Sequence, residues 1–212
     1  MQVVNIKTTK KFEKYITVVS EHKFYFILLL FLIFGMFVGA LSVRLLDGDY
    51  SIFIKQWFGS FIEFRTSFGF WKILFNSFLI SLIYLIIISV SGFGVGGMVI
   101  MPLLVFFKGF GTCLLSGVLY RDYSLHGIAF ADLILLPSAL AANLMLVYLS
   151  ESAMELSKRF YNCINDSNYT NHLLKAECLS YFKRLMYVLF AFVVISVIES
   201  AFNSCFIGYF NF

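Results

Sequence analysis

The chain has 212 residues, of which 60% are hydrophobic and 13% are charged. A mean hydropathy of +0.88 is typical of several transmembrane helices and excludes an ordinary soluble domain. The net charge of +4 is too small to indicate nucleic-acid binding and is better explained by loops rich in Lys and Arg. The four cysteines form no CxxC pair and no metal-ligand spacing, so we expect no metal and no cofactor. The sequence predicts an all-α polytopic membrane helix bundle of about five transmembrane helices in a single domain.

The N-terminal part predicts a short cytoplasmic tail followed by the first membrane span. Residues 1–23 are basic, and residues 24–43 carry no charge. This uncharged run is longer than the core of a usual signal peptide, which favours a helix that stays in the mature protein. Gly35 and Gly39 are spaced i, i+4 and predict a close contact with another helix.

Residues 44–72 predict an outer segment that does not cross the membrane. Asp47-Gly48-Asp49 is a turn signal. Large apolar residues then recur at helical spacing opposite a polar face, which indicates an amphipathic helix in the membrane interface. It is either a plain anchor or a docking surface for another protein. The expected interfacial side chains are Phe53, Trp57, Phe58 and Phe61.

The stretch from Gly92 to Tyr120 is rich in glycine and predicts bent or broken helices. Residues 73–107 carry no charge and are too many for one span, so we expect a turn at Gly92, Gly94 and Gly97. The second and third spans are then about 73–90 and 98–120. The loose GxGxxG spacing has no βαβ context, which argues against a nucleotide-binding loop. Gly109 and Gly111 follow Lys108 closely in the sequence and predict either a helix break or close packing there.

The remainder predicts two more spans separated by a polar hairpin. Residues 121–126 form a polar turn, and the fourth span, 127–150, is broken by Pro137. Residues 151–184 are polar and predict a cytoplasmic helical hairpin, and residues 185–209 form the fifth span. Lys and Arg are more numerous on the side that holds the tail and this hairpin. The N-terminus is therefore predicted in the cytoplasm and the C-terminus outside.

Three ionisable residues fall within predicted spans, namely Lys108, Asp132 and Glu199. A charge at membrane depth is costly unless it has a partner or a function. At a rise of about 1.5 Å per residue, the predicted depths of Lys108 and Glu199 differ by only about 5 Å. We therefore expect these two to form an ion pair, with Asp132 as the second choice. Such a pair either fixes helix packing or belongs to a polar pathway, a proton relay or a recognition site for a partner helix.

The sequence shows no sign of enzymatic activity. It contains no HExxH, no GxSxG and no Walker motif. The chain is therefore predicted to be non-enzymatic, and any work driven by ATP would come from a partner protein.

Several segments taken together resemble the stage II sporulation protein M family. They are LLVFFKGFGTCLLSGVL around Lys108 and Gly109, LILLPSALAANLML around Pro137, and VISVIESAFNSC around Glu199. GMFVGAL in the first span and FNSFLISLIYLI at the start of the second occur in matching order. One departure is that the family often has Thr-Pro soon after the last glutamate, where this chain has Asn203-Ser204.

The resemblance implies a multi-pass protein of the bacterial cytoplasmic membrane that acts as a scaffold for wall-remodelling or other membrane proteins, as in sporulation. Other members of the family look like components for the maturation or export of circular bacteriocins beside an ATP-binding transporter subunit. As an exporter, a chain of five spans without an internal repeat would need a homo-oligomer or a partner chain. Membrane lipids are expected to surround it in either case. Lys108, Gly109, Pro137 and Glu199 match motif positions of the family, and no chemical role follows for them.

Overall fold

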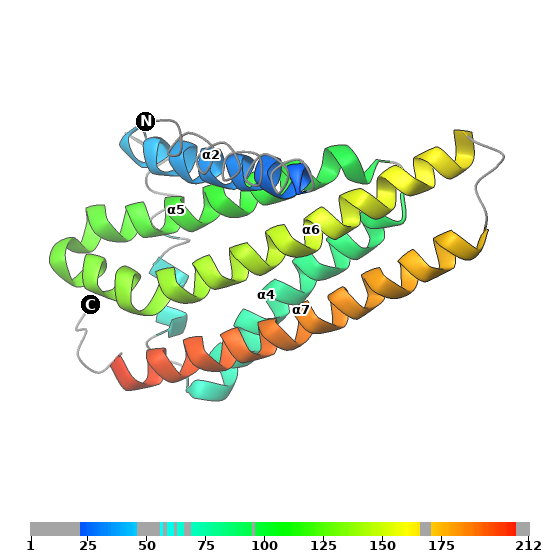
Figure 1. The fold of residues 1–212 in the computed structure, drawn as a ribbon. Coiled ribbons are helices and arrows are strands. Elements are labelled where there is room, and N and C mark those ends of the chain that lie inside the picture. The colour runs from blue at the N-terminus through cyan, green and yellow to red at the C-terminus, as the bar shows by residue number, and fades with distance from the viewer. Residues whose placement is uncertain are drawn as a thin grey trace, which may run out of the picture.

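The computed structural model describes residues 22–45, 56, 59–61, 63–65, 69–94, 96–165 and 171–206. Its elements are α2 (Lys23–Leu45), α4 (Phe70–Gly92), α5 (Gly97–Phe130), the π-helix η1 (Ala131–Leu135), α6 (Leu136–Asn165) and α7 (Asn171–Phe206) (Figure 1). Within these ranges the chain has five helical segments long and apolar enough to cross a membrane. The predicted all-α membrane bundle is confirmed.

Glycines bring α2 and α5 into close contact. A Cβ atom added at Gly35 would overlap the main-chain carbonyl of Phe106, and one at Gly39 would overlap that of Phe110. From α5, Gly109 faces the main chain of α2 in the same way. Small residues allow two helix backbones to approach each other inside a membrane. The close contact predicted from the spacing of Gly35 and Gly39 is therefore confirmed, and Figure 1 shows α2 lying along α5.

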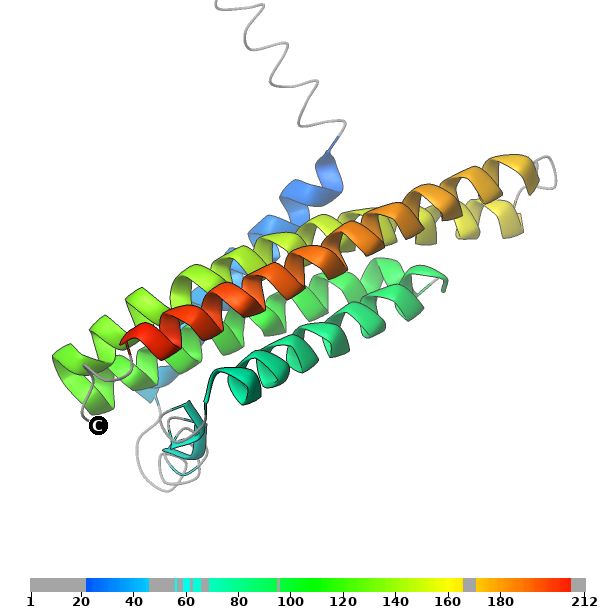
Figure 2. The same cartoon turned by 90° about the horizontal axis from the view of Figure 1, so that it is seen from below.

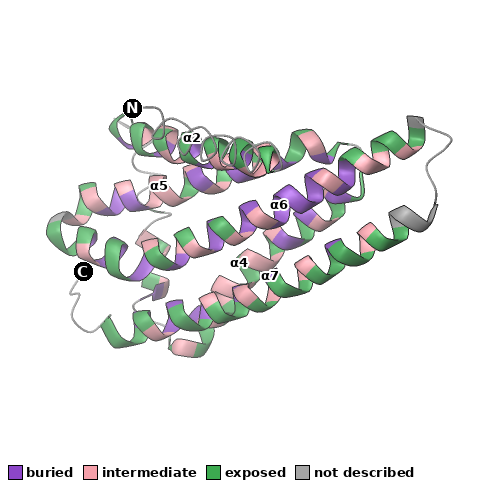
Figure 3. Cartoon of the chain, viewed as in Figure 1, coloured by how far each residue is buried: buried purple, intermediate pink, exposed green. Residues whose placement is uncertain are grey.

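Helix α6 is the central helix of the bundle. Half of its most apolar window is buried, compared with 28% or less in the other four spans. Leu146, Val147 and Leu149 are almost completely enclosed, and Figure 3 shows most of the buried surface along this helix. The surrounding helices direct many large apolar side chains outward. In a membrane those side chains face lipid.

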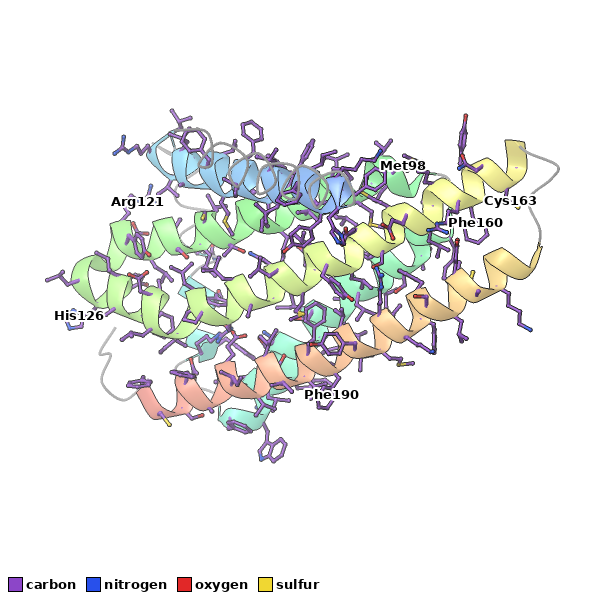
Figure 4. All side chains as sticks on the ribbon, viewed as in Figure 1. Met98, Arg121, His126, Phe160, Cys163 and Phe190 are labelled. Atoms are coloured by element: carbon purple, nitrogen blue, oxygen red, sulfur yellow. The ribbon has the colours of Figure 1, made fainter. Side chains whose placement is uncertain are left out.

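The chain reverses between α5 and α6 without leaving helical structure. The two spans are Gly97–Tyr123 and Leu125–Ile164, and His126 lies at the end of the bundle where the chain turns back (Figure 4). Gly127 packs against the carbonyl group of Leu119, although eight residues of straight helix would separate them by about 12 Å. The chain reverses near the polar turn predicted at residues 121–126, but these residues are helical and form no separate turn.

Backbone irregularities occur at two of the predicted positions. The chain turns between α4 and α5, where the amide of Gly94 donates to the carbonyl of Ser91 (3.2 Å). The five-residue π-helix η1 ends two residues before Pro137, and such insertions are common sites of helix distortion. By contrast, α5 stays helical through Lys108. Gly109 packs closely on α2, Gly111 has open space at its Cβ position, and neither interrupts the helix.

The ends of α6 and α7 project beyond the rest of the bundle. A Cβ atom at Gly92 would meet the hydroxyl of Tyr181 at 3.3 Å, and Ser157 donates a hydrogen bond of 2.7 Å to the carbonyl of Gly94. The α4–α5 turn therefore lies at the level of these two residues of α6 and α7. Both helices continue past it, as Figure 2 shows. This projecting hairpin, residues 158–165 and 171–180, lies inside the segment 151–184 that the sequence predicts as a polar hairpin.

Candidate functional site: a charged cavity within the membrane bundle

A cavity of about 320 Å³ lies among α4, α5, α6 and α7. Its wall carries three charged side chains, those of Arg65, Lys108 and Glu199. Hydroxyl groups also line it, from Ser77, Thr112, Ser138 and Ser196 among others. Polar groups of this number are expensive at membrane depth and indicate either a structural network or a binding site.

Arg65 and Glu199 form a buried ion pair at one end of this cavity. Nη2 of Arg65 donates to Oε1 of Glu199, and the two side chains are 6% and 11% exposed. The hydroxyl of Ser77 donates to Oε2 of the same carboxylate at 2.6 Å. The amide Nδ2 of Asn203 donates to the carbonyl of Arg65 at 3.1 Å, and the guanidinium lies 5.0 Å from the ring centroid of Phe61. Both oxygens of the carboxylate therefore have donors, as a buried charge requires.

Lys108 lies in the same cavity but has a different neighbour. Its Nζ atom is 4.5 Å from the ring centroid of Tyr84, a cation–π geometry. The described residues contain no ion pair between Lys108 and Glu199, so the predicted direct pair is not formed. Lys108 and Glu199 both line the cavity. They do not pair because Arg65 already occupies the carboxylate, and a guanidinium is the better-matched donor for it.

Asp132 lies away from the cavity, at the reversal between α5 and α6. Its Oδ1 atom accepts a hydrogen bond from the hydroxyl of Tyr120. The residue is exposed and belongs to the π-helix η1. Asp132, the second predicted partner of Lys108, is therefore not close to it. Its contact with Tyr120 connects the two sides of the chain reversal.

The predicted helix-break and packing residues lie at four different places. Gly109 contacts α2, whereas Gly111 lines the cavity with open space where a Cβ atom would be. Gly97 lies at the α4–α5 turn with Gly92 and Gly94, and its Cβ position is 3.0 Å from Oγ of Ser157. Pro137 is exposed at the start of α6.

The predicted interfacial helix is described only in part. Phe53, Trp57 and Phe58 lie outside the described residues. Phe61 is half-buried and packs against a core cluster that includes Leu119 and residues of η1. The side chain of Phe61 therefore contacts protein. Arg65, four residues later in the same segment, lines the cavity.

Arg65 is the site residue that sequence reasoning missed. Arg65 belongs to the predicted outer segment, residues 44–72, and is not among the side chains expected at an intramembrane site. Phe61 and Arg65 are four residues apart and share one helix face. An arginine on the apolar face of such a helix is the signal that indicates a buried partner.

Polar contacts also connect α5 to α6 beside the cavity. The hydroxyl of Thr112 donates to the carbonyl of Lys108 at 2.9 Å. In turn, Nδ2 of the fully buried Asn143 donates to this hydroxyl at 3.2 Å. In the part of the chain that is described, no group of His, Cys, Asp and Glu side chains is arranged to hold a metal ion. The arrangement is suited to binding a polar or charged group.

A second, smaller cavity of about 110 Å³ lies between α6 and α7. Four charged side chains line it, Glu155, Arg159, Glu177 and Arg184. Arg159 and Glu177 form an ion pair across the two helices, and Arg184 donates to Oγ of Ser152 at 2.7 Å. These contacts hold the projecting hairpin together near its base.

No known protein family, curated protein or solved structure matches this chain. The resemblance to the stage II sporulation protein M family stays a prediction.

Proposed function

We propose that this chain is a non-enzymatic membrane subunit that docks partner proteins through the projecting α6–α7 hairpin. The helix lengths support a hairpin outside the lipid. α7 has 36 residues and α6 has 30, which correspond to about 54 and 45 Å, whereas the hydrocarbon core of a bilayer is about 30 Å thick. Apart from Glu199, the charged residues of α6 and α7 lie within residues 151–184, toward the hairpin end, which favours water there.

The surface of the projecting hairpin is the observation that carries this proposal. Tyr161, Ile164 and Leu179 are 51%, 77% and 59% exposed. They occur beside the exposed cations Lys158 and Lys175. Large apolar side chains framed by charges on a water-facing surface mark a protein-interaction site. Following the resemblance, the partner would be a wall-remodelling protein or another membrane protein on the cytoplasmic side.

Site-specific photo-crosslinking in the native membrane tests this docking role. We expect a photoreactive residue at Ile164 or Leu179 to give a discrete adduct with a partner protein. Leu30 on α2 is the matched control, because it is also a leucine and is 64% exposed but lies on a lipid-facing span. If the hairpin positions give no more adduct than Leu30, the hairpin is not a docking surface.

A second candidate function is a component for the maturation or export of a bacteriocin or another substrate, working with an ATP-binding partner. The charged cavity favours it, because intramembrane charge is common at transport sites. Purification from the native membrane in mild detergent distinguishes the two candidates. Recovery of an ATP-binding subunit in fixed stoichiometry supports export, and its absence leaves the scaffold role favoured.

A further inference from the structure

We propose that the cavity among α4, α5, α6 and α7 binds the anionic head group of an amphiphile. In this arrangement the head group lies between Lys108 and Arg65, and the hydrocarbon chain leaves the protein between α4 and α5. The proposal does not depend on the docking role of the projecting hairpin.

The charges in the cavity do not balance. Arg65 and Lys108 are cations, and Glu199 is the one carboxylate among the described residues that line it. Glu199 is already satisfied by Arg65 and Ser77. Among the described residues, Lys108 therefore has the face of Tyr84 as the one close partner for its charge. A bound anion would offset this remaining positive charge, which is costly at membrane depth.

The second observation is a set of unused hydrogen-bond donors. Nε and Nη1 of Arg65 are buried and have no hydrogen-bond partner among the described residues. The whole residue is only 5% exposed and lines the cavity. Leaving buried donors unpaired costs free energy, and the fork of guanidinium donors matches the oxygens of a carboxylate or a phosphate. These donors identify the ligand as an oxyanion.

The walls of the cavity indicate where the hydrocarbon chain would lie. Ile80 of α4 and Phe107 of α5 line the cavity and are 42% and 57% exposed, so the cavity wall is not closed at these two side chains. In the proposed arrangement, the hydrocarbon chain passes these two side chains to reach the lipid. Its volume of about 320 Å³ is at the low end for ligand sites. It suits a head group and the first part of a chain, with the rest of the chain in the bilayer.

Carboxylates and phosphates share the chemistry that this site would recognise. A free fatty acid supplies the first, and an acidic phospholipid supplies the second. The test therefore uses both probes, palmitate and phosphatidylglycerol, with zwitterionic phosphatidylcholine as the reference.

The experiment is a lipid titration of the full chain in neutral detergent, read by native mass spectrometry. We expect at least one anionic probe to bind about tenfold or more tightly than phosphatidylcholine, because hydrogen bonds to charged groups are strong. The anionic probe that binds more tightly identifies the source of the oxyanion. Equal binding of all three probes would overturn the proposal.

Two variants and one control locate the bound probe. Lys108→Met should abolish the preference for the anionic probe, whereas Lys183→Met, at an exposed position on α7, should retain it. Gly111→Leu should fill the cavity and weaken binding about tenfold or more while the protein stays folded, since its Cβ position is open and leucine favours helix over glycine.

If Lys108→Met does not fold, Gly111→Leu decides the question by itself. Wild-type binding by a folded Gly111→Leu variant would place the probe elsewhere and contradict the proposal. Crosslinking at Ile164 is read separately, so a failure of this site and a failure of the docking role can be distinguished.

Discussion

Arg65 and Glu199 are 134 residues apart in the sequence and form a buried ion pair in the structure. The pair fastens the segment before α4 to the far end of α7. Ser77 adds a hydrogen bond from α4 to the same carboxylate. Three parts of the chain therefore meet at one charged group, and the packing of the last helix depends on it.

Removing one member of this pair should strongly destabilise the bundle. For Glu199→Ala we expect a loss of about 3–5 kcal/mol, because the guanidinium of Arg65 would remain buried without its counter-charge. The double variant Arg65→Met/Glu199→Leu should recover most of this loss, since the guanidinium that would lose its counter-charge is removed as well, while Lys108 keeps its contact with the ring of Tyr84. Reversible unfolding in detergent measures both. Asp122→Asn, which breaks the more exposed pair with Arg121, is the control and should cost about 0–1 kcal/mol. A Glu199→Ala variant as stable as this control would show that the pair does not hold the bundle.

Alanine substitutions at two glycines, one in the α2–α5 contact and one facing open space on α5, should change stability in opposite directions. Gly39→Ala places a methyl group against the carbonyl of Phe110 and should cost about 1–3 kcal/mol through the forced shift of α2. Gly111→Ala has nothing within 4 Å of its new Cβ atom and should stabilise α5 by up to about 1 kcal/mol. Thermal unfolding in one detergent compares the two. Equal effects of both changes would contradict the packing of α2 on α5.

The outcome for Lys108 shows what sequence patterns can and cannot predict here. Long uncharged runs predict the spans, and the i, i+4 spacing of Gly35 and Gly39 predicts a helix contact, because both depend on residues close together in the chain. The choice between Lys108 and Arg65 as the partner of Glu199 depends on how distant helices pack. Helical rise gives a residue's depth along the membrane but not its direction around the helix axis, so the depth argument identified the wrong cation.

The position of Arg65 has a similar explanation. An amphipathic helix has the same apolar spacing whether its apolar face meets lipid or protein. Phe61 packs on a protein cluster, so at this residue the apolar face meets protein. The cavity also combines side chains from four helices, and no local motif predicts such a combination.

Cysteine labelling should establish which side of the membrane the projecting hairpin faces. Cys163 lies at the hairpin end of α6 (Figure 4), and Cys113 lies within the α5 span. For a variant that retains Cys163 alone, we expect a membrane-impermeant maleimide to react in inverted vesicles and not in intact cells. A variant that retains Cys113 alone should stay unlabelled in both until detergent is added. Labelling of Cys163 in intact cells would show that the predicted cytoplasmic orientation is wrong.

The hydrogen bond between Asn143 and Thr112 should contribute modestly to the contact between α5 and α6. Asn143 is fully buried and donates to Oγ1 of Thr112 at 3.2 Å, while Thr112 also bonds to the carbonyl of Lys108 within α5. Interhelical hydrogen bonds in membranes contribute about 0.6 kcal/mol on average, because polar groups find other partners in the unfolded state. A double-mutant cycle with Asn143→Leu and Thr112→Val should therefore give a coupling of about 0.6 kcal/mol and at most about 1.7 kcal/mol. Ser89→Ala removes a hydroxyl that bonds to its own helix at Leu85 and should show no coupling to Asn143→Leu. A coupling near zero for Thr112→Val as well would mean that packing, rather than this hydrogen bond, holds α5 against α6.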